Sequence, residues 1–437
     1  MAAISESPHS FAVDPPARTT NRVLALCFLT IVTEGYDIGV MGTIVPSMLA
    51  DPVWKLTPIE VGAMSSAALF GTLFGSYFIS VLTDLIGRKR LLIACVALFS
   101  LSMLGAALSP TPFVFGVMRF IGGLGLGGVI SAAAALTVEY SPAAKRNLNF
   151  AIMYSGYAIG ALISAVAGIA FLGAHGWRFV VGIGALPLIA IPFLIAMLPE
   201  SLAYLMASGR TREAQTLAER LGLSLSAIDA IPAANAAGPS IKSVFDEVFS
   251  RGNLWPTLCL WVAQIAAVLV IYGLGTWLPQ LMRKLGYDLG SSLTFLAVFM
   301  LSSAIGGILI GQVSDRIGAR KTIVGGYVIG ALAICGLTIK GSVTTNYVLV
   351  ALAGLGSIGV AMVQLGYIAN FYRPFARASA TGWAVGVGRF GAMAGPMVGA
   401  WFASSHLDVR LNFVAFAVSG LVAALAIALS SSKQHDV

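Results

Sequence analysis

Charged residues are scarce in this sequence. Asp, Glu, Lys and Arg together make up 10% of its 437 residues, whereas hydrophobic residues make up 58%. Soluble domains contain about 25% charged residues, because a folded surface in water must be covered with polar groups. A chain of this composition cannot cover itself in that way, so its expected solvent is lipid.

Cysteine and histidine are also rare, and each occurs four times. The cysteines lie inside apolar stretches, which argues against disulfides and against a metal cluster. The histidines lie outside these stretches, which argues against a histidine relay for protons. The sequence also lacks a nucleophile–base pair and a phosphate-binding loop, so we expect neither an enzyme nor a bound cofactor. These residues are Cys27, Cys95, Cys259 and Cys335, and His9, His175, His406 and His435.

What the sequence has instead is a series of long apolar runs. A helix of about 20 residues crosses the ~30 Å hydrocarbon core of a bilayer. Unpaired backbone groups are costly in lipid, so runs of this length must be helical. We therefore predict an all-α polytopic membrane protein with twelve transmembrane helices. They cover residues 22–49, 58–83, 90–109, 112–140, 147–172, 177–198, 254–281, 290–313, 321–340, 345–370, 378–404 and 410–431.

One polar stretch, residues 199–253, divides these runs into six and six. Basic residues gather in this stretch, near both termini and in the loops on the same side. By the positive-inside rule that side is cytoplasmic, so the net charge of +8 indicates topology and not nucleic-acid binding. The predicted parts are a cytoplasmic tail (1–21), a six-helix bundle (22–198), a cytoplasmic linker (199–253), a second six-helix bundle (254–431) and a cytoplasmic tail (432–437).

The two halves repeat one pattern. A shift of 231 residues carries Gly87 onto Gly318, and it carries other residues of the same loop onto matching types. Parallel repeats of six spans, with a substrate site at their interface near the midplane, are typical of alternating-access carriers. The loop resembles the cytoplasmic loop motif of the major facilitator superfamily, although Ser80 and Leu85 depart from it. In that motif glycine tightens the turn, and an acid paired with arginine across the interface holds the cytoplasmic side shut.

We predict that six residues form this cytoplasmic gate. For the basic residues among them, the alternative is that their charge serves only to set the membrane topology. The gate residues are Asp84, Gly87, Arg88, Glu139, Asp315 and Arg316.

Four ionisable residues lie deep inside apolar runs. Glu34 and Asp37 share one face of the first span because they are three residues apart. Arg119 in the fourth span lies at a matching depth, by a rise of ~1.5 Å per residue. Ionisable groups are costly in a bilayer and by default mark a functional pathway. A purely structural ion pair between the first and fourth spans is the alternative.

The fourth buried residue, Arg389, has no acidic neighbour in its own half. A visiting carboxylate would satisfy its guanidinium group through two hydrogen bonds. The alternatives are a backbone carbonyl or the acids of the first span. Competition between these acids and a substrate carboxylate for Arg119 and Arg389 would couple transport to protons.

Several stretches together resemble the aromatic acid:proton symporter family of the major facilitator superfamily, although Glu34 stands where that family more often has Asp. The resemblance implies import of benzoate-like or hydroxybenzoate-like anions with protons, and an essential role for the acids of the first span and the two arginines. The stretches are Glu34-Gly-Tyr-Asp37, Leu136-Thr-Val-Glu139-Tyr140-Ser-Pro142, Leu198-Pro-Glu200-Ser201, Trp277-Leu-Pro279 and Gly382-Trp383-Ala-Val-Gly386-Val-Gly388-Arg389.

Aromatic and amide side chains can stack on a substrate ring or bond its substituents. The candidates are Tyr36, Tyr154, Tyr272, Trp277, Gln364, Tyr367, Trp383 and Asn370. We expect a monomeric carrier in the bilayer of a bacterial inner membrane, with a small organic anion as substrate and the proton as coupling ion. An exporter of other anions or metabolites, and a membrane sensor that does not transport, remain alternatives.

Overall fold

The computed structural model describes residues 15–79, 82, 85–223, 241–339, 341–373, 376–405 and 407–430. Within these ranges the chain is helical, and no strand occurs in them. The helices of the first half are α1 (Ala17–Leu49), α2 (Pro58–Phe74), η1 (Gly75–Ile79), α4 (Arg88–Ala107), α5 (Pro112–Glu139), η2 (Ala143–Lys145), α6 (Arg146–Ile183) and α7 (Pro187–Met197). Those of the polar stretch are α8 (Leu202–Ala207), α9 (Thr211–Leu221) and α11 (Ile241–Val248). Those of the second half are α12 (Leu254–Lys284), α13 (Leu289–Ile317), α14 (Ala319–Gly336), α15 (Val343–Gly354), η3 (Leu355–Gly359), α16 (Val360–Phe371), α17 (Arg377–Ser404) and α18 (Arg410–Leu429).

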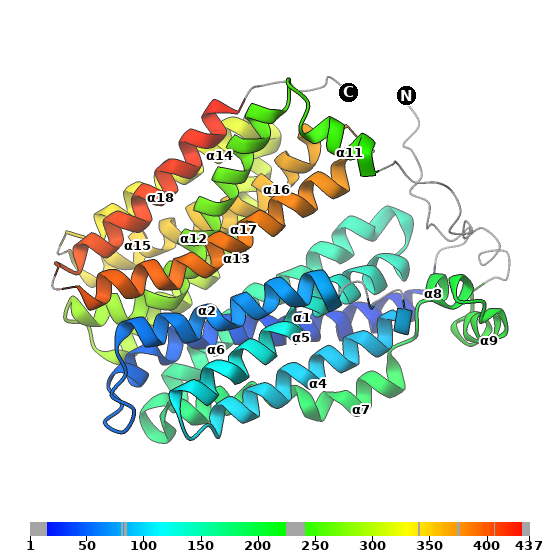
Figure 1. The fold of residues 1–437 in the computed structure, drawn as a ribbon, viewed down its shortest axis with the longest axis horizontal. Coiled ribbons are helices and arrows are strands. Elements are labelled where there is room, and N and C mark those ends of the chain that lie inside the picture. Colours follow the sequence, from blue (N-terminus) through cyan, green and yellow to red (C-terminus); the bar gives the residue numbers. More distant parts are fainter. Residues whose placement is uncertain are drawn as a thin grey trace.

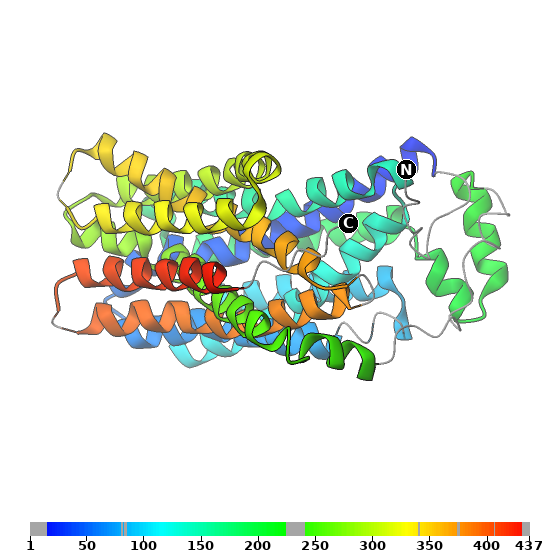
Figure 2. The same cartoon turned by 90° about the horizontal axis from the view of Figure 1, so that it is seen from above.

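The helices form two bundles that match the two halves of the sequence (Figures 1 and 2). Figure 1 shows α1–α7 as one bundle and α12–α18 as the other, with α2 alongside α17 where the bundles meet. We call the end that carries α8, α9 and α11 the linker end, and the other the opposite end. The two bundles lie close together at the opposite end and spread apart toward the linker end (Figure 1).

Within the part of the chain that the structure describes, ten segments are long and apolar enough to cross a membrane. One of them, Leu148–Met197, has 50 residues, and its helical course is broken at Gly176, where φ is 75°. Because a single crossing needs about 20 residues, this segment is long enough for two. The 28-residue helix α17 is not among the ten. Dividing the long segment and adding α17 is consistent with the twelve predicted spans.

Several helices that begin at the opposite end are capped by polar side chains. The Thr57 hydroxyl accepts the N–H of Glu60, and Glu60 accepts the N–H of Thr57, which forms a capping box before α2. Thr111, Asp288 and Ser342 cap α5, α13 and α15, and each side chain accepts one backbone N–H of the first turn. These caps satisfy N–H groups that have no partner inside the helix, and they fix where each helix begins.

Three clusters of buried apolar residues show how the halves are joined. One cluster occupies the opposite end and contains residues of both halves, from Tyr36 and Phe115 to Trp277 and Phe416. At the linker end the first half has a cluster of its own around Leu92, and the second half has another around Ile323. The described part of the molecule is therefore closed at the opposite end and parted at the linker end.

The halves meet at the opposite end along a seam, by which we mean the contacts of α1 and α2 with α12 and α17. A Cβ atom at Gly42 would lie 1.9 Å from the carbonyl oxygen of Gly275, and one at Gly62 would lie 2.5 Å from the Cβ of Ala400. The Ser66 hydroxyl donates a 2.8 Å hydrogen bond across the seam to a backbone carbonyl of α17. Small residues therefore let the two halves approach closely at the seam, and at Gly42 backbone faces backbone.

The connection between α1 and α2 is anchored at this closed end. Asp51 accepts hydrogen bonds from Trp177 Nε1 (2.9 Å) and from the backbone N–H groups of Val53 and Trp54. Partial burial alone would raise the pKa of Asp51, but these hydrogen bonds, together with the nearby Arg178, lower it below its usual value. Arg178 also lies over the rings of Trp54 and Trp177. The connection is thus tied to the start of the sixth predicted span.

Some predicted boundaries differ from the structure. The first helix begins at Ala17, inside the segment 1–21 that we predicted as a tail. The described part of the polar stretch 199–253, predicted as a linker, contains the helices α8, α9 and α11. Their residues pack on separate halves: α8 and α9 join the core of the first half, and α11 contacts α17 in the second.

Candidate functional site

The acid and the arginine predicted to meet across the first half do so. Asp37 on α1 forms an ion pair with Arg119 on α5, and their side chains are 2% and 4% exposed. Arg119 Nη2 also lies 3.5 Å from the backbone oxygen of Asp37. Water is thus excluded from both groups. The pair neutralises two charges within one half, and Arg119 is closed to a ligand in this state.

Glu34 lies about one helical turn from Asp37, but unlike Asp37 it forms no ion pair within 4.0 Å among the described residues. Its side chain is 2% exposed, and Oε2 has no hydrogen-bond partner among the described residues. Its main favourable electrostatic partner is Arg389 of the other half. The neighbouring Gly35 lets α6 approach closely, since a Cβ there would lie 2.0 Å from the backbone oxygen of Tyr157. This packing brings the tyrosines of α6 beside Glu34.

Arg389 on α17 is partly exposed. It donates no hydrogen bond to, and forms no ion pair within 4.0 Å with, any residue in the described ranges. Its electrostatic neighbours are Glu34, Tyr154 and Tyr157 of the first half and Tyr272 of its own half. A Cβ atom at Gly391 would lie 2.1 Å from the backbone oxygen of Ile265, so α17 packs tightly on α12 and holds Arg389 near Tyr272. A cation that has neither an ion pair within 4.0 Å nor a hydrogen bond among the described residues therefore lies at the junction of the halves.

Three tyrosines surround this cation. The hydroxyl groups of Tyr157 and Tyr272 are 3.0 Å apart, which makes a hydrogen bond from α6 to α12 across the two halves. The rings of Tyr154 and Tyr157 are parallel within 3°, with centroids 6.1 Å apart. Tyr157 was not among the predicted ring contacts. It lies three residues after Tyr154, on the same face of one helix, and that spacing was the signal available in the sequence.

Three other predicted ring contacts are buried within the packing of one half. Tyr36 is buried in the first half and donates to the backbone oxygen of Val180 at 2.6 Å. Trp277 is fully buried, and its Nε1 donates to the backbone oxygen of Pro396 at 2.8 Å. Gln364 is fully buried in the second half. None of these side chains is placed to contact a ligand at Arg389 in this state, because each lies within the packing of one half.

The remaining predicted contacts lie toward the linker end. Tyr367 and Asn370 line a hollow between α13, α14 and α16 in the second half. Trp383 packs against Phe249, with ring centroids 5.8 Å apart, and against Phe245 on α11. These residues therefore lie apart from the group of three tyrosines around Arg389.

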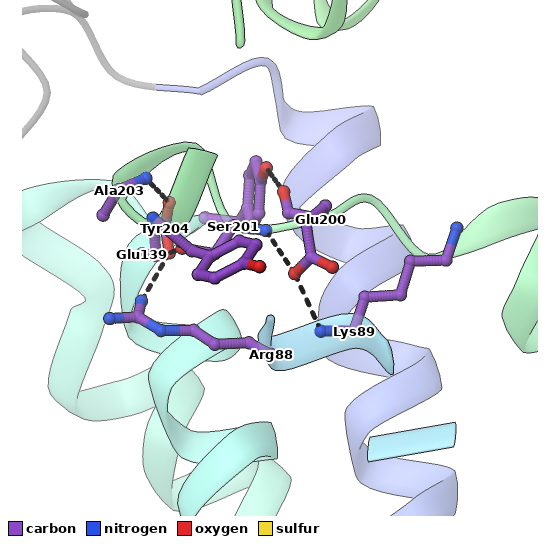
Figure 3. Close-up of polar contacts among 8 residues, drawn as sticks. Arg88, Lys89, Glu139, Glu200, Ser201, Ala203 and Tyr204 are labelled. Carbon is purple, nitrogen blue, oxygen red and sulfur yellow. Dashed lines mark hydrogen bonds and ion pairs between the residues drawn. The ribbon is translucent and has the colours of Figure 1, made fainter. Parts of the chain in front are cut away.

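Two predicted gate residues of the first half, Arg88 and Glu139, belong to a polar cluster within that half. Arg88 Nη1 lies 2.6 Å from Glu139 Oε2, and Glu139 also accepts the Ser201 hydroxyl at 2.6 Å and the N–H of Ala203 at 3.0 Å (Figure 3). Glu200 accepts the backbone N–H of Lys89 at 2.9 Å. The cluster ties α8 to α4 and α5, so the start of the polar stretch is fixed to the first half.

At this end no ion pair joins the two halves among the described residues. Asp84 lies outside the residues that the structure describes. Asp315 and Arg316 are exposed, and no ion pair joins either to another described residue. The two repeated glycines behave as predicted, since Gly87 and Gly318 have φ values of 100° and 92° before α4 and α14. Glycine adopts this backbone conformation without strain.

Comparisons with known proteins agree with this architecture. The model of the Major Facilitator Superfamily matches residues 27–363 and 294–435. Among solved structures, a partially occluded inward open conformation of the xylose transporter XylE from E. coli superposes with a TM-score of 0.72 at 16% identity, covering 93% of this chain and 98% of that one. An inward-facing bacterial homologue of the lysosomal transporter Spinster superposes with a TM-score of 0.69 at 16% identity, covering 95% of each chain.

Closer relatives are found by sequence. The chain is 30% identical to the benzoate transport protein of Acinetobacter baylyi over 94% of its own length and 90% of the relative's. It is 32% identical to the gentisate transporter of Corynebacterium glutamicum, covering 91% and 85%. It is 31% identical to the 4-hydroxybenzoate transporter PcaK of Pseudomonas aeruginosa, covering 95% and 93%. These relatives are transporters and not enzymes. The chain therefore belongs to the major facilitator superfamily, and within it to the family of the aromatic acid transporters.

Proposed function

We propose that this protein imports a small aromatic carboxylate, of the benzoate or hydroxybenzoate type, together with protons by alternating access. The observation that carries the proposal is Arg389, a cation without an ion-pair partner in the described chain, at the junction of the two halves. A guanidinium group is always charged and donates in a fork that fits a carboxylate. The transport proteins named above for benzoate, gentisate and 4-hydroxybenzoate support an aromatic anion as the ligand.

The surrounding residues suit the rest of such a molecule. Tyr154, Tyr157 and Tyr272 offer ring faces for stacking and hydroxyl groups for hydrogen bonds. Because Tyr157 and Tyr272 belong to different halves, a ligand between them would contact both bundles. Its binding would then bias the arrangement of the halves, as alternating access requires.

Coupling to protons would follow from competition for Arg389. An ionised Glu34 and a substrate carboxylate are both attracted to the same guanidinium group, so protonation of Glu34 favours substrate binding. Release of substrate on the cytoplasmic side would leave Arg389 to Glu34, which would then give up its proton. Asp37 and Arg119 already neutralise each other, so we assign them the role of holding α1 against α5 in this state.

The orientation is part of the proposal. The basic residues of 199–253 and of the loops on the same side favour a cytoplasmic linker end. The structure, parted at that end, then corresponds to an inward-facing state of a monomeric carrier in a bacterial inner membrane.

Proteoliposomes that contain the purified protein provide the test. Labelled benzoate and 4-hydroxybenzoate should accumulate when the outside is acidic, and a protonophore should abolish accumulation. Arg389→Leu should abolish binding and uptake. Glu34→Gln should keep exchange of labelled for unlabelled substrate but lose accumulation, because only the proton step is removed.

Arg283→Leu, which removes an exposed arginine at the opposite end, serves as the matched control and should transport normally. Accumulation that persists after collapse of the proton gradient would exclude proton coupling. Uptake by Arg389→Leu equal to that of the parent would exclude the proposed anion site.

A further inference from the structure

A chain of buried hydrogen bonds connects three helices of the second half. Tyr327 on α14 donates its hydroxyl proton to Gln364 Oε1 on α16. Gln364 Nε2 donates in turn to Gln264 Oε1 on α12 at 2.8 Å. The three side chains are 2%, 0% and 5% exposed. Reversing one amide alone would place N–H against N–H or O against O, so the two amides take their orientations together.

The chain ends on an N–H group without an acceptor. Gln264 Oε1 is occupied by Gln364, so Gln264 Nε2 carries the free donors, and it donates to none of the described residues. Gln264 is only 5% exposed, but its Nε2 atom is not fully buried, so a ligand can reach this donor. The end of the chain therefore lacks a partner that a ligand could supply.

This free end lies beside the candidate site. A Cβ atom at Gly388, the residue before Arg389, would lie 2.8 Å from Gln264 Cγ and 3.3 Å from Gln264 Nε2. Gln264 is 10 residues into α12 and Arg389 is 12 residues into α17, which places them ~15 Å and ~18 Å from the starts of these helices at the linker end. The amide and the guanidinium group thus lie at nearly one depth, on neighbouring helices.

We infer that Gln264 is a substrate-binding residue whose amide N–H donates to an oxygen atom of the bound aromatic acid, next to Arg389. Gln364 and Tyr327 are positioning residues, which hold the amide with its nitrogen toward the ligand. This inference rests on the proposed function and names a specificity contact within its site. Both a carboxylate oxygen and a ring hydroxyl oxygen can accept from an amide, and the two are separated by the choice of substrates below.

The test measures initial uptake rates in proteoliposomes for benzoate, 3-hydroxybenzoate, 4-hydroxybenzoate and 2,5-dihydroxybenzoate. Loss of one such hydrogen bond should raise KM about tenfold in Gln264→Leu, with the maximal rate little changed. An equal rise for all four substrates assigns the contact to the carboxylate, and a rise confined to hydroxylated substrates assigns it to the ring. Gln264→Glu should raise KM further than Gln264→Leu, because it adds a negative charge near the bound anion. Gln280→Leu, the same change elsewhere on α12, should leave KM unchanged.

The positioning residues have a separate readout. Tyr327→Phe should raise KM for the same substrates as Gln264→Leu, and the double variant should be no worse than Gln264→Leu alone. A purely structural role would instead lower the yield of folded protein and would add independently in the double variant. If Gln264→Leu does not fold, Gln264→Asn withdraws the amide by one methylene and should show the same substrate pattern.

These experiments separate a failure of the role of Gln264 from a failure of the proposed function. If the parent protein takes up none of these acids, the proposed function itself fails. If the parent transports them and Arg389→Leu does not, but Gln264→Leu keeps the KM of the parent for all four, then only the role of Gln264 is overturned.

Discussion

The buried ion pair of Asp37 and Arg119 gives an asymmetric prediction for stability. Asp37→Leu leaves a guanidinium group that cannot lose its proton, at a site where the side chain is 4% exposed. Stranding a buried charge in this way costs about 3–5 kcal/mol of unfolding free energy. Arg119→Leu leaves a carboxyl group that can become neutral by binding a proton, so it should cost less, about 1–3 kcal/mol.

The double variant should be more stable than Asp37→Leu alone, because two apolar side chains can replace the pair without leaving a charge. The sum of the two single effects should therefore exceed the double effect by more than about 2 kcal/mol. Titration of the purified protein in lipid micelles with dodecyl sulfate, followed by circular dichroism, measures these differences. Single variants as stable as the parent, or a double effect equal to the sum of the two, would refute a buried, mutually neutralising pair.

The remaining predictions concern the contacts between the halves and the closed end. Gly42→Val should prevent closure of the seam, because a Cβ atom at this position would lie 1.9 Å from the backbone of the other half. Uptake should be lost, and an impermeant reagent should label a cysteine introduced at the opposite end more quickly. Tyr157→Phe removes the hydrogen bond to Tyr272 and should shift the same labelling rate about two- to tenfold; an unchanged rate would show that the bond does not hold the halves together. Hydrogen bonds lower the pKa of Asp51, so the ionised carboxylate stabilises the fold fully above about pH 4, and this stabilisation is lost as the pH falls further. Asp51→Asn should therefore lower the melting temperature at pH 7, and should lower it by less at pH 3.

Much of the fold could be predicted from the sequence because lipid restricts the possible structures. Apolar runs of about 20 residues must be helices, so the order of the helices and the division at 199–253 follow from hydrophobicity alone. The ion pair of Asp37 with Arg119 was also predictable, because depth along a straight helix is proportional to residue number. The positive φ of Gly87 and Gly318 follows from the need for a tight turn.

Residue number does not give rotation about the helix axis, and the errors have this origin. Tyr36 lies two residues after Glu34, so it faces away from it into the first half and donates to Val180. Gln364 was predicted to meet a ligand, but it acts from within the second half on Gln264, which no pattern in the sequence singled out.

The glycine contacts at the closed end have a consequence for the speed of the cycle. Where Gly42 meets Gly275, the surfaces that separate are smooth. Interlocked large side chains would have to change rotamer before the bundles could part, and each would add to the barrier. Flat backbone surfaces lose only weak dispersion contacts, each of about 0.1–0.2 kcal/mol, and these return as soon as the bundles meet again. At this contact the two helices can part and meet again in every turnover without a change of rotamer.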